Sequence, residues 1–499
     1  MLFNSYEFIL LFLPALLAGI YLLRGFGRRW LEVLLILASL FFYGWWDPRY
    51  LPLLLGSVLV NYLGALFIER TRSRFALAAI IAFNLGLLAC YKYLGFFSRI
   101  ASDAIREDPF DLTLLAIVLP LGISFYTFQQ IGYQVDRWRG EEPKHNFIDY
   151  LLFVIFFPQL IAGPIVRFSE FLPQMQRFAE RLGARNLLVG LTIFSIGLFK
   201  KVVLADTFAL YATPVFNTAG SGVALDGQTA WLGVFAYTLQ IYFDFSGYSD
   251  MAVGLGRMLG INLPLNFNAP YRSVSITEFW RRWHITLGRF LRDYLYFPLG
   301  GSRVGLARHF VNLMVVMLLC GLWHGAAWTF VVWGGLHGLA LTIHRLWIRQ
   351  FPASGRRGLV GRAFGWSLTF LFVVVTWVFF RADSLDTSFA MLQSMFNPAS
   401  FGAPVEVENL GGEAGFSGVT FGWTAIVLAI IWVLVAPTTQ ELMRRTMRAA
   451  MYRPYIQQAT AILRPCWRKS PGWVMGSAAV FAVAFLGLSR ISEFIYYNF

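Results

Sequence analysis

Long apolar runs with few charged residues alternate with short polar segments along the whole chain. A helix that crosses a bilayer needs about 20 mainly apolar residues. The candidate spans are 8–23, 31–46, 50–68, 75–97, 114–135, 186–199, 229–245, 251–263, 309–347, 364–380, 423–436 and 473–488. The run 309–347 is long enough for two crossings. The pattern predicts an all-α polytopic membrane protein, one bundle over residues 1–499 with about 11–13 spans.

Two segments interrupt this regular pattern. In 147–168, Pro158 and the pair Gly163 and Pro164 break a run that would otherwise cross the membrane, which predicts a re-entrant or broken helix. Such backbone is tolerated at membrane depth where it is buried in protein or lines a cavity, so we expect this segment to border a site. In 275–295, tryptophans alternate with arginines, which predicts an amphipathic helix at the interface or folded into the mouth of the bundle.

The composition supports the membrane interpretation and excludes an ordinary soluble enzyme. Hydrophobic residues make up 57% of the 499 positions and charged residues only 14%, against about 25% charged in soluble domains. The net charge of +14 follows the expected topology. Segments 345–362 and 441–469 are basic and 383–413 is acidic, which places the first two in the cytoplasm and the third outside. Nucleic acid is therefore not needed as a partner to explain the charge.

The cysteines and the first residues add little chemistry. Cys90, Cys320 and Cys466 are too few and too scattered to predict a disulfide framework or a zinc site, and we expect no metal. The first apolar run lacks the basic segment that opens a signal peptide, so we expect a retained first helix with its N-terminus outside.

Two histidines are the main candidates for chemistry. His324 lies within an apolar run, where an imidazole either takes a proton near neutral pH or is a neutral side chain bonded to a neighbouring helix. His284 follows Arg281 and Arg282, which could hold an anionic carrier such as a CoA phosphate. The alternative for His284 is an interfacial anchor, because Trp, Arg and His are common at lipid headgroups.

Spacing from His324 indicates whether His337 and Cys320 could act with it in catalysis. On one continuous helix His337 would lie roughly 20 Å from His324 and on nearly the opposite face, which favours packing or substrate positioning over shared catalysis. Cys320 lies one turn before His324, which allows a Cys–His acyl relay, although buried cysteine is usually a small apolar filler. We favour the filler.

A polar cluster ends the apolar run 229–245. Asp244 and Asp250 flank Tyr248 and Ser249, and buried carboxylates at such a place need a basic partner. A structural ion pair with Lys200, Lys201 or the arginines near His284 is favoured over a catalytic role.

Several separated blocks together resemble the membrane-bound O-acyltransferase family, and within it the membrane subunits of bacterial alginate O-acetylation. The blocks are 121–126, 162–167, 243–251, 276–284, 291–296 and 321–325, with 41–46 extending the likeness towards the N-terminus. The resemblance implies a helical bundle around a central tunnel, with the core of the active site in 113–347. It is less clear after about residue 385.

The resemblance also implies site residues. His324 would be the catalytic histidine in the tunnel and His284 a second polar position lining it. The further candidates for donor binding or tunnel lining are Trp323, Arg281, Arg282, Asp244, Tyr248, Ser249 and His337.

The implied activity is acetyl transfer from a cytoplasmic thioester, acetyl-CoA or another acyl thioester, to an exported polysaccharide, with alginate as the expected polymer. No bound cofactor is implied. The expected setting is the bacterial inner membrane, in contact with lipid and with periplasmic acetyltransferase partner proteins. The alternative from the residues alone is a proton-coupled transporter or flippase of a cell-envelope precursor, whose buried His, Asp and Arg would relay protons.

Overall fold

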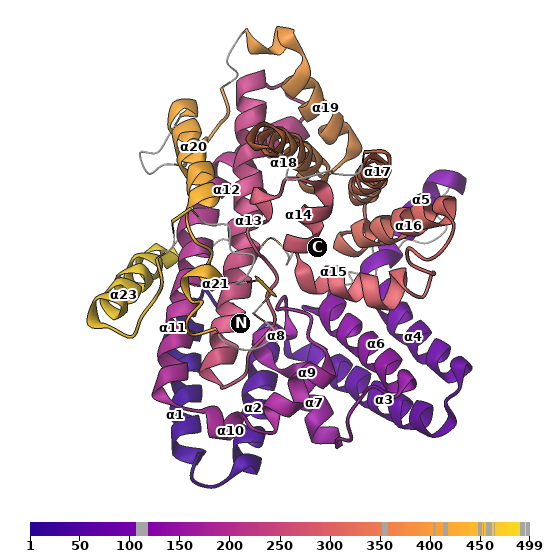
Figure 1. Cartoon of the computed structure of the whole chain (residues 1–499), viewed down its shortest axis with the longest axis vertical. Helices are drawn as coiled ribbons and strands as arrows, with labels where there is room; N and C mark the ends of the chain where they lie inside the picture. The colour runs from indigo at the N-terminus through magenta and orange to yellow at the C-terminus, as the bar shows by residue number, and fades with distance from the viewer. Residues whose placement is uncertain are drawn as a thin grey trace. The chain divides into compact units, whose positions relative to one another are not determined.

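The computed structural model describes residues 1–105, 118–351, 358–402, 406–412, 418–447, 452, 454–455, 462–463, 465–489 and 495. Within these residues the chain is helical and contains no strand, which confirms the all-α prediction (Figure 1). The expected start of the core at residue 113, and residues 114–117 of the fifth expected span, lie outside the described residues.

The chain divides into two compact units. Unit 1 comprises Met1–Phe194 and Tyr248–Pro264, and unit 2 comprises Ser195–Gly247 and Leu265–Phe499. Two helices continue from one unit into the other along the chain, α11 (Ala184–Phe199) and α13 (Gly227–Met258). The expectation of a single domain stays a prediction.

Unit 1 is built from helices joined by short turns. The helices that lie wholly in it are α1 (Leu13–Leu23), α2 (Arg28–Gly44), α3 (Leu51–Thr71), α4 (Arg74–Leu88), α5 (Leu94–Ile105), α6 (Ile123–Arg139), α7 (Phe147–Ile155), α8 (Phe157–Leu160), α9 (Phe168–Met175) and α10 (Phe178–Arg181). A wider π-helical turn, Glu7–Phe12, leads into α1, and another, Ala89–Tyr93, joins α4 to α5. Buried amides join three of these helices, since Asn61 of α3 exchanges hydrogen bonds with Asn84 of α4 and accepts one from Gln134 of α6. Such contacts hold helices together where lipid gives no hydrophobic drive.

The break predicted in 147–168 is confirmed. α7 ends before Phe156, whose ψ of 105° turns the chain out of the helix, and α8 has Pro158 in its first turn. The chain then leaves the helical path until α9 begins at Phe168. Gly163 is needed at the tight turn because a Cβ there would lie 2.4 Å from the Cα of Gln159.

Unit 2 carries the other helices. They are α12 (Asp206–Gly220), α14 (Ile276–Arg282), α15 (Ile285–Leu291), α16 (Leu306–His324), α17 (Trp328–Gln350), α18 (Leu359–Arg381), α19 (Leu385–Phe396), α20 (Val419–Val435), α21 (Thr439–Leu442) and α23 (Pro471–Leu486). π-helical turns at Lys200–Ala205 and Arg292–Tyr296 follow α11 and α15, and single 3₁₀ turns occur at Pro270–Arg272, Pro398–Phe401 and Gly487–Ser489.

The two expected spans 229–245 and 251–263 are not separated by a turn, because one helix contains the first span and residues 251–258 of the second. α13 runs unbroken through the polar residues between them. Asp244, Ser246 and Ser249 are buried there, so their polarity marks a packed interior and not a loop. The separate spans were therefore a wrong prediction, because a polar run in sequence does not distinguish a turn from a buried polar cluster.

The run 309–347 forms a helical hairpin, as its length allowed. The chain turns between His324 and Trp328, and α16 and α17 then pack closely against each other. Glycines permit this approach: a Cβ on Gly321 would lie 2.2 Å from the carbonyl oxygen of Phe330, and one on Gly334 would lie 2.3 Å from that of Met317. Small residues at a helix–helix contact are typical of membrane bundles.

Within the part of the chain that the structure describes, five helical stretches are long and apolar enough to cross a membrane. They are Pro48–Thr71, Arg74–Ser102, Ala184–Gly220, Leu306–His324 and Leu359–Arg381, and three shorter apolar helices are Glu7–Leu23, Val419–Val435 and Pro471–Leu486. Many large apolar side chains on them are exposed, including Phe75 and Leu359. Lipid covers such faces in a multi-pass membrane protein.

Candidate active site

His284 lies at the junction between two short helices of unit 2. α14 ends at Arg282 and α15 begins at Ile285, so the expected single amphipathic helix over 275–295 is interrupted. His284 adopts a φ of +41° and is only 1% exposed. Positive φ in a residue other than glycine costs roughly 1–3 kcal/mol and persists only where neighbouring structure enforces it. The same burial excludes a lipid-headgroup anchor for this side chain.

Hydrogen bonds on both sides of His284 enforce its conformation. The Asn268 N–H donates to the carbonyl oxygen of Arg282 (3.0 Å), and the Ile285 N–H donates to that of Asn266 (2.9 Å). The Thr286 hydroxyl also donates to Asn266 Oδ1 (2.6 Å). The loop 266–268 therefore fixes the backbone of the turn that carries His284.

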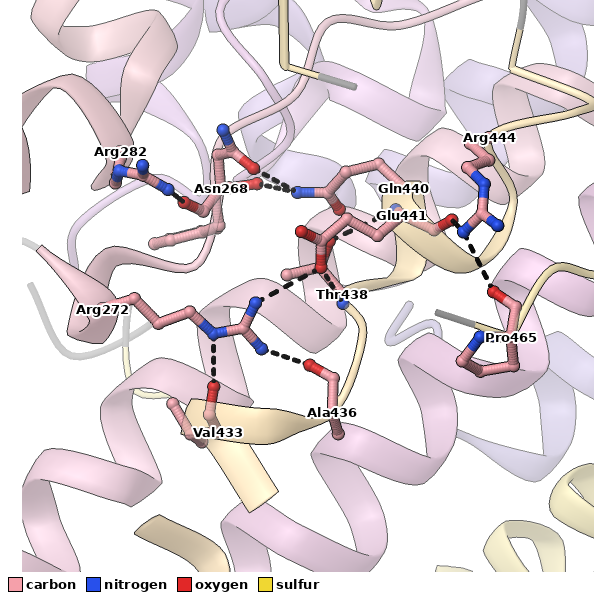
Figure 2. Close-up of polar contacts among 11 residues, drawn as sticks. Asn268, Arg272, Arg282, Val433, Ala436, Thr438, Gln440, Glu441, Arg444 and Pro465 are labelled. Carbon is pink, nitrogen blue, oxygen red and sulfur yellow. Dashed lines mark hydrogen bonds and ion pairs between the residues drawn. The ribbon is translucent and has the colours of Figure 1, made fainter. Parts of the chain in front are cut away.

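A segment near the C-terminus holds this loop in turn. Gln440 of α21 donates from its amide to the carbonyl oxygen of Phe267 (2.7 Å). Arg282 donates to the carbonyl oxygen of Asn268 (3.1 Å; Figure 2). Sequence reasoning assigned no role to residues after 385, because nothing local in them indicates that they reach a loop more than 160 positions earlier.

Arg272 also binds the segment 433–441, which contains Gln440. Its guanidinium donates to the carbonyl oxygens of Val433 (2.8 Å) and Ala436 and forms an ion pair with Glu441 (3.4 Å; Figure 2). Glu441 also receives the N–H of Thr438, closing a capping box at the start of α21. The charged groups are buried but paired, which is the condition under which burial is tolerated.

His324 is the last residue of α16 and lies beside His284. The two imidazole rings are 6.4 Å apart, centroid to centroid, and His324 is 2% exposed. Aromatic rings surround the pair: Trp333 and Phe380 lie 5.3 and 5.1 Å from His324, and Phe245 lies 4.8 Å from His284. Trp323, which was predicted to line the site, lies 4.9 Å from His324 and 5.9 Å from His284.

His337 is held in one tautomer. The indole N–H of Trp280 donates to His337 Nδ1 (3.2 Å), so the proton of the neutral ring is on Nε2, which faces the hydroxyl of Thr376 at 3.1 Å. The Thr376 hydroxyl itself donates a hydrogen bond to the carbonyl oxygen of Val373. Both ring nitrogens are therefore engaged, which suits a positioning residue and not a base.

The hairpin corrects the assumption of one continuous helix from His324 to His337. The chain folds back after His324, so Trp333 of α17 contacts both His324 and His337, at 5.3 and 4.8 Å. Spacing along a helix had placed the two histidines on opposite faces, which does not hold across a turn.

The residues of the polar cluster in α13 make structural contacts. Asp244 forms an ion pair with Lys201 (2.7 Å), which also contacts Asp206 (3.0 Å), as the structural interpretation of the sequence predicted. Tyr248 belongs to unit 1, where its ring stacks on Phe3 at 4.8 Å, and Ser249 is buried in the same unit. The role of Tyr248 and Ser249 in lining a tunnel stays a prediction.

The two arginines before His284 have different surroundings. Arg282 is buried in an ion pair with Glu278 (2.8 Å) and is occupied within the protein. Arg281 is exposed, and donor binding by it stays a prediction. Cys320 is fully buried one turn before His324.

Sequence reasoning missed three aromatic residues of the site: Phe245, Trp333 and Phe380. Each lies in an apolar helix where nothing in the pattern separates it from other core aromatics, and only the fold brings them to the histidines. Within the described part of the chain, the indole N–H of Trp333 has no hydrogen-bond partner although it is buried. No group of three or more His, Cys, Asp or Glu in the same residues could hold a metal ion.

Comparison with known proteins supports a family assignment. Residues 141–381 match the membrane-bound O-acyltransferase family. The chain is 43% identical over 430 residues to a peptidoglycan O-acetyltransferase of Helicobacter pylori, covering 79% of this chain and 80% of that one. It is 43% identical over 418 residues to a probable alginate O-acetylase, AlgI, of Pseudomonas aeruginosa, covering 80% and 75%. A teichoic acid D-alanyltransferase of Lacticaseibacillus rhamnosus is 28% identical over 372 residues, covering 69% and 87%.

These likenesses cover most of the chain, and the family match includes every helix that supplies a ring to the histidine pair. The chain belongs to the membrane-bound O-acyltransferase family.

Proposed function

We propose that this protein transfers acetyl groups from a thioester donor to hydroxyls of a cell-envelope polysaccharide, with His324 as the general base and His284 as its partner. The observation that carries the proposal is the pair itself. Two imidazoles lie 6.4 Å apart in a buried aromatic shell within a family of acyltransferases. Imidazole is the side chain best suited to exchange a proton near neutral pH.

The chemistry needs few groups. The acceptor hydroxyl loses its proton to His324 as its oxygen attacks the thioester carbonyl. The carbon–sulfur bond of the donor then breaks, and the leaving thiolate takes that proton from His324, which becomes neutral again. A hydrogen-bond donor is needed where negative charge develops on the carbonyl oxygen. The indole N–H of Trp333, buried next to His324, is suited to that role. No covalent acyl-enzyme is required.

The proposal also names the acyl donor, the acceptor polymer and the membrane in which the protein works. Acetyl-CoA is the proposed donor, because it is the common cytoplasmic acetyl thioester and the basic segments of the chain suit a polyanion. Alginate is the acceptor expected from the sequence, and the relatives named for alginate and for peptidoglycan support these two polymers equally, at 43% identity each. The protein would work in the inner membrane, within a polysaccharide-modification complex that includes periplasmic acetyltransferase partner proteins.

The proposal is tested with purified protein in neutral-lipid nanodiscs supplied with labelled acetyl-CoA and an acceptor polysaccharide. The wild type is expected to release CoA and label the polymer, and His324→Ala is expected to do neither. His145→Gln is the matched control, since His145 lies in unit 1, where its two ring nitrogens contact the Tyr133 hydroxyl (2.7 Å) and the carbonyl oxygen of Pro143 (2.8 Å). A transporter or flippase would leave the donor intact, and equal donor consumption by His324→Ala would overturn the mechanism.

A further inference from the structure

Unit 2 contains a second candidate site at the other end of the α16–α17 hairpin from His324. A cavity of about 340 Å³ is lined by Ser302, His309, Arg345 and Arg349 together with three aliphatic side chains. His309 is in the first turn of α16, and the two arginines are in the last two turns of α17. The cavity is thus built by the same two helices that carry the candidate active site.

The charge lining this cavity has one sign. Arg345 and Arg349 are four residues apart and lie on the same face of α17, where two like charges destabilise a helix. No acidic residue lines the cavity, and within the described residues neither arginine makes a hydrogen bond or an ion pair. Elsewhere in unit 2 the chain pairs its arginines, as Arg272 with Glu441 and Arg282 with Glu278.

This arrangement matches an anion with several oxygens. Guanidinium groups bind phosphate with paired, charge-assisted hydrogen bonds. Ser302 offers a hydroxyl and His309 an imidazole to the same space. The positive-inside rule accounts for arginines near a helix end, but it does not require them to share a cavity.

The position of the cavity relates it to the proposed reaction. His309 and His324 are fifteen residues apart on α16, which corresponds to about 22 Å along the helix axis. A CoA-type thioester carries its phosphates at one end and its acyl group at the other, separated by an extended pantetheine chain. Phosphates bound at the start of α16 would leave the acyl group free to reach the end of that helix.

We propose that the cavity lined by Arg345 and Arg349 is a phosphate subsite for the acyl donor. The identity of the donor rests on the proposed function, whereas the binding of phosphate in this cavity does not depend on it. Arg345 and Arg349 lie in the segment 345–362, which is predicted to be cytoplasmic, and activated thioesters are made in the cytoplasm. The cavity replaces Arg282, which is occupied by Glu278, as the place where donor phosphates are held.

The test compares the double variant Arg345→Gln/Arg349→Gln with a charge-matched double control, Arg308→Gln/Arg362→Gln. Arg308 and Arg362 are exposed residues in the first turns of α16 and α18, and neither lines the cavity. Binding of adenosine 3′,5′-bisphosphate is measured first, in phosphatidylcholine nanodiscs and in the His324→Ala background. Loss of two charge-assisted contacts is expected to weaken binding about ten- to a hundredfold in the cavity variant and not in the control.

Kinetics then links the site to the donor. With acetyl-CoA the cavity variant is expected to show a raised KM and an unchanged kcat. With S-acetylpantetheine, which lacks phosphate, it should match the wild type. A phospholipid site is the alternative source of phosphate: if the cavity arginines retain phosphatidylglycerol but not the bisphosphate, the donor subsite is overturned.

The readouts separate this proposal from the proposed function. Bisphosphate binding lost only in the cavity variant supports the subsite even if no acetyl transfer is detected. Equal binding in the variant and the control, or an equal rise in KM with both donors, would overturn it.

Discussion

His284 combines burial with a backbone conformation that few residues adopt. Its φ of +41° is held by hydrogen bonds to Asn266 and Asn268 on either side. Strained residues enforced by their surroundings cluster at functional sites. The sequence identified His324 as an ionisable residue in an apolar run and His284 as part of an amphipathic, arginine-rich stretch, but it contained no signal for Trp333 or Phe380. Their contact with His324 depends on how three helices pack, which residue spacing within one helix does not encode.

Cys320 tests whether the acyl group passes through the protein. It is fully buried and packed as a small apolar side chain. Cys320→Ala is therefore expected to keep most of the acetyl transfer rate. The measurement is labelled-polymer formation at equal protein, with a search for a hydroxylamine-sensitive acyl label on the wild type. A label that disappears in Cys320→Ala, together with inactivity of that variant, would show a covalent route.

At the scale of elements, the α16–α17 hairpin sets the geometry of the site. The turn between His324 and Trp328 brings Trp333 against His324, and Trp333 in turn contacts His337. Length alone predicted two crossings in this run. The residues that meet across the turn were not predictable, because periodicity indicates which face of a helix is buried but not which residues of another helix pack on it.

Glycine contacts in the hairpin yield a stability prediction. A Cβ on Gly321 would lie 2.2 Å from a backbone oxygen, whereas one on Gly335 would lie 3.6 Å from a leucine methyl group. Gly321→Ala is expected to destabilise the folded protein by about 1–3 kcal/mol through overpacking and to reduce activity. Gly335→Ala, the control, should change neither. Melting temperature in detergent and transfer rate measure both, and equal behaviour of the two variants would contradict the packing described.

Breaks in helices were predictable to different degrees. Pro158 and Gly163 marked the interruption after α7 because each has a direct steric effect on the backbone. The cluster around Asp244 was misread as a break in α13, because Lys201 pairs with it inside unit 2 and removes the need for a loop.

For the whole molecule, charge distribution predicts the orientation in the membrane. The basic segments 345–362 and 441–469 are expected in the cytoplasm and the acidic segment 383–413 outside. The structure describes only parts of these segments, and 352–357, 403–405, 413, 448–451, 453, 456–461 and 464 lie outside the described residues. The composition predicted a helical membrane protein correctly, since 57% hydrophobic residues in long runs leave few alternatives.

Cysteine labelling tests this orientation. Cys90, Cys320 and Cys466 are all free and can be replaced first. A single cysteine at Glu406 should react with a membrane-impermeant maleimide from outside, and one at Arg349 only after the cytoplasmic face is opened. Reaction of the Glu406 probe from the cytoplasm alone would show that the span count after His309 is wrong.

The central claim is that His324 and His284 act as one catalytic unit, and a double-substitution cycle tests it most directly. The kcat/KM for acetyl transfer is measured for His324→Ala, His284→Ala and the double variant, each shown to be folded by gel filtration. We predict that each single change lowers the rate by about 10² or more and that the double variant is no slower than the slower single one. Losses that multiply, or a wild-type rate in His324→Ala, would contradict the account.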